Sequence, residues 1–285
     1  MLYGRILSGN DWLMTLVQWF AFLGTIICIS KIAAHLGLNE KMQRVAAVFF
    51  ATLPMAILQA SSTQNDLVET FWIVCLAERL LAWNKEGNAR YSLEFGLALG
   101  LAILTKGTAY PIAFPLVLFF AVKSVVHYKK RLAWSICAAA VCLALNMPHY
   151  IRNYNYFGNP IEANSATVSS FTINSFFVSS FSNIYSNIPA PLPKSLELKE
   201  ELNTFGKEIY PYGSPEIYSL KNWKDSDYGG IISFYEDKAV NTIHFLLLAS
   251  SIIFLVSNKK AKKKYALIVL ASWAMFFFCI PWQPW

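Results

Sequence analysis

The chain has 285 residues, of which 55% are hydrophobic and 14% are charged, so it is too apolar for an ordinary soluble domain. Its formal net charge of +7 would suit a nucleic-acid-binding protein, but the basic residues gather in short connections between apolar blocks. That distribution argues against a nucleic-acid partner and favours a polytopic membrane protein.

The apolar residues form blocks long enough to cross a membrane. A transmembrane helix needs about 20 apolar residues to span a hydrocarbon core of about 30 Å. About eight blocks approach this length, at residues 12–32, 45–60, 67–83, 92–104, 110–126, 132–147, 242–256 and 265–282. We therefore predict an all-α polytopic membrane protein with about eight transmembrane helices.

The basic residues predict the topology of this bundle. Most of the 24 Lys and Arg residues fall in four connections, near residues 31–44, 79–90, 123–131 and 259–264. By the positive-inside rule these connections face the cytoplasm, where they contact anionic membrane lipids. We expect a multi-pass protein of the cell (inner) membrane with three parts: a bundle of about six helices at 1–148, an extracytoplasmic loop domain at 149–240, and two further helices at 241–285.

Two features of the chain ends predict a fragment. Residues 1–11 fall outside the membrane without a cleavable signal peptide, and the sequence stops at IPWQPW as the last block emerges. We expect the chain to be a piece of a longer membrane protein.

Several familiar kinds of site are missing from the sequence. The five cysteines lie inside apolar blocks without the spacing of a zinc or redox motif, so we interpret them as small core residues. There is no P-loop, Gly-rich dinucleotide fingerprint, nucleophile elbow or HExxH motif. A soluble nucleotide-dependent catalytic domain is therefore not expected.

The third block begins with a polar segment, SSTQND, that ends at Asp66. Asn65 or Asp66 there can cap the helix, with Glu69 in its first turn, and this would stabilise the helix by about 0.5 to 2 kcal/mol. Alternatively, Asp66 is a carboxylate at an extracytoplasmic cleft that binds an acceptor or a divalent metal. The two roles are compatible.

Further along the same block lie Glu78 and Arg79. At 1.5 Å per residue, Glu78 lies about 18 Å below Asp66, a depth at which a charge must be paired or face the bundle interior. Residues adjacent in sequence do not face each other on a helix, so we expect Glu78 and Arg79 to contact other helices rather than each other. We interpret them as a structural contact.

Lys106 follows the fourth block in the segment LTKGTAYP. A lysine at this level can extend to the membrane interface, or it can hold a lipid phosphate as a point charge. Gly107 and Pro111 should end the helix there and let the backbone approach a ligand.

The segment NMPHYIRNYNYFGNPI, residues 146–161, forms a polar collar where the sixth block ends at Pro148. Its tyrosines suit an interfacial anchor. If it instead handles a charged head group, His149, Tyr150, Arg152 and Asn153 are its candidate substrate-binding residues. The Arg152 guanidinium can hold a phosphate bidentately, whereas a lone His149 without a nearby carboxylate in sequence is a poor metal ligand.

In this order, the polar segments resemble those of a known family. They are residues 52–66, 96–107, 147–161 and the terminal WQPW. Together they resemble the membrane glycosyltransferases of the GT-C fold that use polyprenyl-phosphate sugars, namely the family 39 or protein-mannosyltransferase-like group.

The resemblance implies sugar transfer from a polyprenyl-phosphate-linked donor to a lipid, glycan or protein acceptor at the extracytoplasmic face. A carboxylate would activate the acceptor and basic groups would stabilise the departing phosphate. Position by position, Asp66 matches the family's second outer-loop acidic residue and is our candidate catalytic residue. Lys106 and Arg152 match its phosphate contacts. The resemblance names no definite cofactor, and a divalent metal stays open.

One departure from the family concerns its principal catalytic carboxylate, which lies in an outer loop before the first block found here. Residues 1–11 are what this sequence retains of that region, and we interpret Asp11 as a helix cap. Two other functions stay open: a polytopic transporter or flippase of lipid-linked sugars, and a noncatalytic membrane scaffold.

Overall fold

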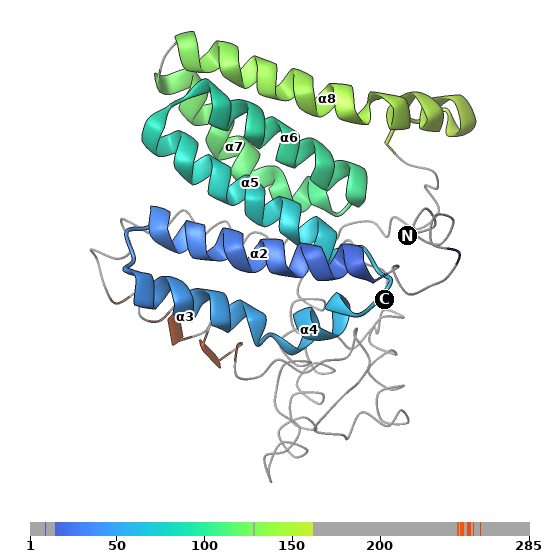
Figure 1. Ribbon diagram of the computed structural model, residues 1–285. Helices are drawn as coiled ribbons and strands as arrows, with labels where there is room; N and C mark the ends of the chain where they lie inside the picture. Colours follow the sequence, from blue (N-terminus) through green and yellow to red (C-terminus); the bar gives the residue numbers. More distant parts are fainter. Residues whose placement is uncertain are drawn as a thin grey trace, which may run out of the picture. The chain divides into compact units, whose positions relative to one another are not determined.

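The structure is a computed structural model that describes residues 9, 15–127 and 129–161, with positions 244, 246, 247, 250, 251, 253 and 257. The predicted loop domain beyond residue 161, the block at 265–282, most of the block at 242–256 and most of the first 14 residues lie outside the described residues. All the labelled helices belong to one unit of the chain (Figure 1).

Within the described residues, all the labelled regular elements are α-helices. In chain order they are α2 (Leu16–His35), α3 (Glu40–Ala51), α4 (Pro54–Ala60), α5 (Asp66–Glu86), α6 (Ala89–Thr105), α7 (Ala109–His127) and α8 (Lys129–Phe157). The predicted all-α class is thus confirmed over this region, and five of the first six apolar blocks each correspond to one helix.

The exception is the second block, 45–60, which we expected to be one helix. It is divided between α3 and α4, whose axes are bent by 67°. Pro54 is the first residue of α4, and Leu53 before it has extended backbone angles. A proline lacks the N–H that would continue α3 and disfavours helical geometry in the preceding residue, so the block breaks there.

Three described helices are long and apolar enough to cross a membrane: α2, α7 and α8. The bent pair of α3 and α4 would make a fourth if it forms one span. The other two helices differ in composition and length, because α5 carries charged side chains along its length and α6 has 17 residues. The described region therefore supports a helical membrane protein with fewer clear spans than we predicted.

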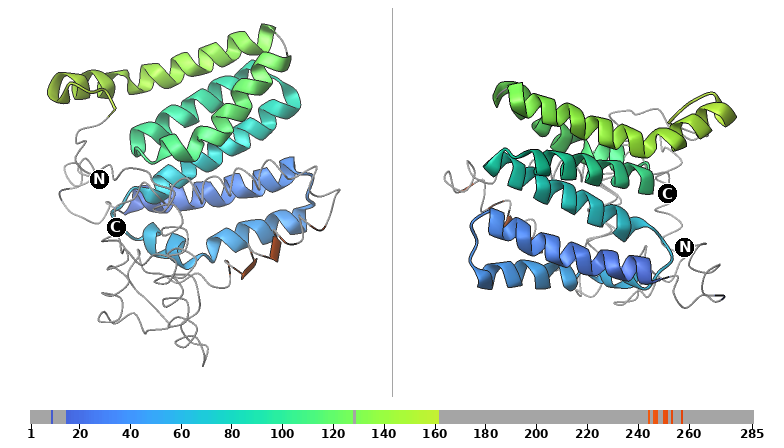
Figure 2. Two further views of the ribbon diagram at one scale, coloured as in Figure 1. Left: turned by 180° about the vertical axis from the view of Figure 1, so that it is seen from behind. Right: turned by 45° about the horizontal axis from the view of Figure 1, so that its top comes forward.

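Helix α5 lies at the centre of the unit. Figures 1 and 2 show α2 on one side of it, with α3 and α4 beyond, and α6 and α7 on the other side, with α8 outermost. The central helix also carries two buried carboxylates, Glu69 and Glu78. Its neighbours on both sides therefore decide what those carboxylates contact.

The helices alternate in direction, which gives the unit two ends. At the end that we call the α6–α7 end, the beginnings of α2, α5 and α7 meet the end of α6. At the opposite end, which we call the α5–α6 end, the last turn of α2 meets α5, and α5 meets the beginning of α6. The two ends carry different polar groups.

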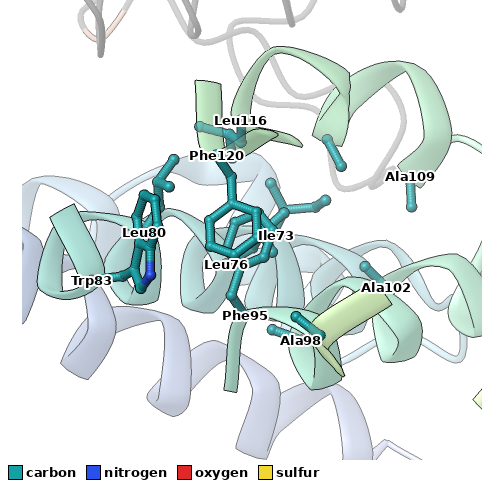
Figure 3. Packing of buried hydrophobic residues seen from close by; sticks show 12 residues of the cluster. Ile73, Leu76, Leu80, Trp83, Phe95, Ala98, Ala102, Ala109, Leu116 and Phe120 are labelled. Carbon is teal, nitrogen blue, oxygen red and sulfur yellow. The ribbon is translucent and has the colours of Figure 1, made fainter. Parts of the chain in front are cut away.

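Apolar side chains fill the space between α5, α6 and α7. The aromatic rings of Phe95 and Phe120 stack with centroids 4.2 Å apart, and Trp83 packs against Phe120 at 4.5 Å (Figure 3). Leu76 and Leu80 belong to the same cluster and are almost inaccessible. Aromatic pairs add about 0.5 to 1.5 kcal/mol each beyond the area that they bury. This core fixes the three helices that carry most of the polar groups described below.

Helices α6 and α8 run in the same direction and approach each other closely. A Cβ atom added to Gly96 would lie 2.2 Å from the backbone oxygen of Ala138, so a side chain does not fit there. Further along, the side chain of Asn146 donates to the backbone oxygens of Gly100 and Cys142, both at 3.0 Å. Small residues at a helix contact are typical of membrane bundles.

Our prediction that the sixth block ends at Pro148 is wrong. Helix α8 continues through Pro148 to Phe157, and Gly158 follows it with a positive φ of 70°. One proline removes a single backbone hydrogen bond, and membrane helices tolerate this when their surroundings compensate. The chain turns instead after Gly158, where Ile161 donates its N–H to the side chain of Asn159 at 3.0 Å.

Candidate functional site

The α6–α7 end brings together two of the residues that the sequence singled out. Asp66 is the first residue of α5, and Lys106 directly follows α6. The Lys106 ammonium donates to the Asp66 carboxylate and forms an ion pair with it. Both side chains stay partly accessible, with exposed fractions of 31% for Lys106 and 28% for Asp66.

The Asn65 side chain does not cap α5. Asn65 occupies the N-cap position, as expected, but its side chain makes no capping hydrogen bond. Its amide donates instead to the backbone oxygen of Thr105 at 2.9 Å, at the last turn of α6. Carbonyls in the last turn of a helix lack intrahelical partners, so the bond satisfies α6 and ties it to α5.

A second carboxylate lies one turn after Asp66 on α5. Glu69 has an exposed fraction of 5%, and the Thr108 hydroxyl lies 2.6 Å from one of its carboxylate oxygens and 2.7 Å from the other. Residues three apart on a helix are neighbours on its surface. Asp66 and Glu69 therefore both face the short turn between α6 and α7.

These two contacts differ in strength because their burial differs. A partly exposed ion pair such as Asp66–Lys106 contributes about 0 to 1 kcal/mol, since water screens it. A hydrogen bond to a charged group contributes about 1.5 to 3 kcal/mol, and Glu69 is buried. The Asp66–Lys106 pair is thus the contact that a charged ligand displaces at lower cost.

Helix α8 reaches the same end of the unit through a tyrosine pair. The hydroxyls of Tyr110, in the first turn of α7, and Tyr150 lie 2.6 Å apart. At 1.5 Å per residue, the part of α8 from Tyr150 to Phe157 adds about 10 Å of further helix. Figure 1 shows this part extending past the ends of the neighbouring helices, and Tyr156 and Phe157 on it are exposed.

The remaining predicted residues form a local cluster on this part of α8. The Arg152 guanidinium lies 3.0 Å from Nδ1 of His149, and the Asn153 side-chain amide lies 3.2 Å from Nε2 of the same ring. Asn153 is buried and also donates to the backbone oxygen of Pro160 at 3.4 Å. Asn153 thus holds the reversed chain against α8.

The predicted site residues thus fall into two groups at the same end of the unit. Asp66 and Lys106 join α5 to the α6–α7 turn, while Tyr150 joins α8 to α7. The contacts of Arg152 that the structure describes are local to α8. The structure therefore supports a shared end for these residues, and their use of one ligand remains a proposal.

A metal site was left open by the sequence. Among the described residues, no group of three or more His, Cys, Asp or Glu side chains is arranged to hold a metal ion. Both ring nitrogens of His149 face side chains of α8, and Asp66 faces Lys106. The described residues thus give a metal no ready set of ligands.

A second charged cluster lies at the α5–α6 end, and one expectation about it is wrong. We expected Glu78 and Arg79 to contact other helices, and both do, but we did not expect them to contact each other, and Arg79 donates to the Glu78 carboxylate. The long arginine side chain reaches back to its neighbour and also donates to Glu94 of α6 at 2.5 Å. His35 of α2 lies 3.0 Å from Glu78, which is 2% exposed. These contacts agree with our interpretation of Glu78 and Arg79 as a structural contact between helices.

The part of the sequence that forms these helices matches a known protein family. The sequence model of the dolichyl-phosphate-mannose-protein mannosyltransferase family matches residues 2–151. The chain belongs to this family. Comparison with curated proteins and with solved structures gives no match. Family membership and the apolar helices together indicate a membrane protein of the GT-C glycosyltransferase type.

The family match covers part of the candidate site. Asp66, Lys106, His149 and Tyr150 lie inside the matched residues 2–151, whereas Arg152 lies just beyond them. The match also covers the bundle from α2 to most of α8. Both residues of the ion pair at the α6–α7 end therefore lie inside the matched region.

Two polar contacts at this end were not expected from the sequence. Thr108 contacts Glu69, and Gln18 of α2 accepts a hydrogen bond from the backbone N–H of Val68 at 3.1 Å. Gln18 is fully buried, and it supplies an acceptor to the first turn of α5. A single amide within the apolar block 12–32 was the signal that could have drawn attention to it.

Proposed function

We propose that the chain is a membrane glycosyltransferase that transfers a sugar from a polyprenyl-phosphate carrier to a lipid, glycan or protein acceptor. The observation that carries the proposal is the meeting of Asp66 and Lys106 at one end of the bundle, within the region that matches the family. Both side chains are accessible enough to meet a ligand.

In the proposed reaction the acceptor hydroxyl attacks the anomeric carbon of the sugar. The bond from that carbon to the phosphate oxygen breaks, the phosphate leaves with the bonding electrons, and the hydroxyl proton passes to a carboxylate. Lys106 would stabilise the negative charge on the departing phosphate. Arg152, which is exposed, would supply a second, bidentate contact to it.

Asp66 is our candidate for the carboxylate that takes the proton of the acceptor hydroxyl. Its described charged partner is Lys106, and a phosphate that binds the Lys106 ammonium would release the Asp66 carboxylate from that partner. His149, Tyr150 and Asn153 would line the ligand from α8. By the resemblance, the family's principal carboxylate belongs to a region before α2, most of which lies outside the described residues.

Substitutions that remove the charge test the assignment. In a sugar-transfer assay with polyprenyl-phosphate donors, Asp66→Asn, Lys106→Gln and Arg152→Gln should each lower kcat/KM by at least about tenfold, which is about 1.4 kcal/mol of transition-state stabilisation. Lys41→Gln and Arg44→Gln, on the exposed surface of α3, are the matched controls and should leave kcat/KM unchanged. Unchanged activity in all three site variants would refute the assignment.

The proposed topology has its own test. We propose that the α6–α7 end and residues 149–240 face the extracytoplasmic side of the cell (inner) membrane, because the basic connections lie at the other end. A cysteine placed at Ser61, which is exposed in the connection before α5, should react with a membrane-impermeant reagent added to intact cells. Reaction only after the membrane is permeabilised would reverse the topology.

Transport of a lipid-linked sugar is the main alternative. The bend between α3 and α4 is the observation in its favour, because transporters use broken helices at their binding sites. Those sites are built from two matched broken helices, whereas the described residues contain one broken helix, formed by α3 and α4. Movement of the donor across vesicle membranes without sugar transfer would favour this alternative.

A further inference from the structure

The turn between α6 and α7 is held to the beginning of α5 at three successive points. Each point joins α5 or its N-cap to the last residue of α6 or to the turn that follows it: Asn65 to the backbone oxygen of Thr105, Asp66 to Lys106, and Glu69 to Thr108. One turn of helix therefore holds one short turn of chain. Lys106 is the middle of the three points.

The three points differ in how exposed they are. Glu69 is 5% exposed, whereas the Lys106 side chain is 31% exposed and faces its partner from the surface. Water and a charged ligand therefore compete for Lys106 more easily than for the Thr108 hydroxyl. The contacts at Thr105 and Thr108 can therefore stay in place while Lys106 exchanges its partner.

The surroundings of the turn leave room for a ligand. Gly107 lies between Lys106 and Thr108, and apart from these three residues no described residue has a heavy atom within 4 Å of a Cβ atom added to it. The residue next to Lys106 on this turn is therefore not packed against other described residues.

We propose that Glu69 and Thr108 are positioning residues that hold the α6–α7 turn while Lys106 exchanges the Asp66 carboxylate for the phosphate of the lipid-linked donor. The inference rests on the proposed function and adds two residues to it. When the phosphate takes the ammonium, the Asp66 carboxylate loses its partner and becomes available to the acceptor. Donor binding thereby prepares the carboxylate that the transfer needs.

Threonine substitutions on the same turn provide a matched test. Thr108→Val removes the hydroxyl that contacts Glu69 and keeps the shape of the side chain. Thr105→Val is the control, because the Thr105 hydroxyl donates within its own helix to the backbone oxygen of Leu101 at 2.7 Å. Thr108→Ser keeps a hydroxyl at this position, so it should not show the defect of Thr108→Val.

In the sugar-transfer assay, Thr108→Val should raise the KM for the polyprenyl-phosphate donor about tenfold, with a smaller change in kcat. A merely structural role would lower the amount of active protein and leave KM unchanged. Glu69→Gln, which keeps an acceptor for the Thr108 hydroxyl but removes the charge, should give an intermediate rise in KM. If Thr108→Val does not fold, Glu69→Gln and Thr108→Ser still provide the test.

A second readout does not need activity. Lys106 in the purified full chain is labelled with a water-soluble amine reagent, and its labelling is followed by peptide mass spectrometry with polyprenyl monophosphate in the micelles. The lipid should protect Lys106, and Thr108→Val should need about tenfold more lipid for the same protection. Thr105→Val should behave like the unchanged chain.

The outcomes separate the inference from the proposed function. Equal protection in Thr108→Val and Thr105→Val, with an unchanged KM, would overturn the positioning role and leave the glycosyltransferase proposal standing. Absence of Lys106 protection in the unchanged chain, together with absence of sugar transfer, would overturn the proposed function itself.

Discussion

The two ends of α5 differ in the contacts that their charged residues make. At the α5–α6 end, the Glu78 carboxylate has two partners, His35 and Arg79, and Arg79 continues to Glu94. At the α6–α7 end, the side-chain contacts described for the two carboxylates of α5 are one ammonium and one hydroxyl. The first cluster is closed by its own members, whereas the second keeps capacity for further donors.

The difference teaches that charge alone does not mark a functional site in this bundle. The α5–α6 end has more charged side chains in contact, yet their mutual pairing satisfies them. A carboxylate has about four positions for hydrogen-bond donors, and Glu69 is buried with one described hydroxyl beside it. The number of charges alone therefore does not distinguish the proposed site.

The largest expected effect comes from breaking the closed cluster. Glu78→Ala leaves Arg79 and His35 without their shared carboxylate and should lower the free energy of unfolding by about 3 to 5 kcal/mol. Asp66→Ala, at the other end, removes a partly exposed pair and should cost about 0 to 1 kcal/mol. Reversible unfolding in mixed micelles measures both. Equal losses would contradict the distinction between the two ends.

Two glycines, one on α6 and one just after it, give the next largest effect. Gly96→Ala places a Cβ atom 2.2 Å from the backbone of Ala138, so α6 and α8 must separate. Overpacking of this kind costs about 1 to 3 kcal/mol. Gly107→Ala, in the open turn, should leave stability within about 0.5 kcal/mol of the unchanged chain. The same unfolding measurement compares the two variants, and a cost at Gly107 like that at Gly96 would show that the turn is closely packed.

The smallest effect concerns the link between α7 and α8. Tyr110→Phe removes a hydroxyl that lies 2.6 Å from that of Tyr150, and its loss should cost about 0.5 to 1.5 kcal/mol. Tyr156→Phe is the control, since Tyr156 is 78% exposed and should show no change. Sugar transfer should fall in Tyr110→Phe if α8 takes part in the site. Normal activity in this variant would contradict a role of α8 in the proposed site.

Much of the helical pattern could be predicted from the sequence, because apolar blocks in a membrane protein have few other structures open to them. The errors lie at prolines. Pro54 breaks a block that composition alone joins, while Pro148 is carried inside α8. The same residue type acts differently because the outcome depends on neighbouring helices, which a single sequence does not show.

The candidate site was predictable in part for a related reason. Asp66 and Lys106 are charged residues beside apolar blocks, so they stand out, and the alternating direction of the helices brings them to one end. Thr108 and Gln18 are neutral and resemble ordinary helix-end or core residues. Their roles follow from partners far away in sequence, on the first turn of α5.

The contact between Glu78 and Arg79 was missed for a different reason. Neighbouring positions on a helix point in different directions, and that rule describes where side chains begin. The arginine side chain is long enough to bend back, so its guanidinium donates both to Glu78 and to Glu94. Sequence spacing alone does not show where a long side chain ends.

Side-chain hydrogen bonds tie α8 to its neighbours at three described positions, and one of them joins Ser135 to Ser124 of α7 at 2.6 Å. The other two, from Asn146 to Gly100 and from Tyr150 to Tyr110, lie just before Arg152 and hold this part of α8 against α6 and α7. One residue inserted between Tyr150 and Arg152 would turn the guanidinium by about 100° around the helix axis. Such an insertion would therefore point Arg152 away from the direction that it has beside the α6–α7 end.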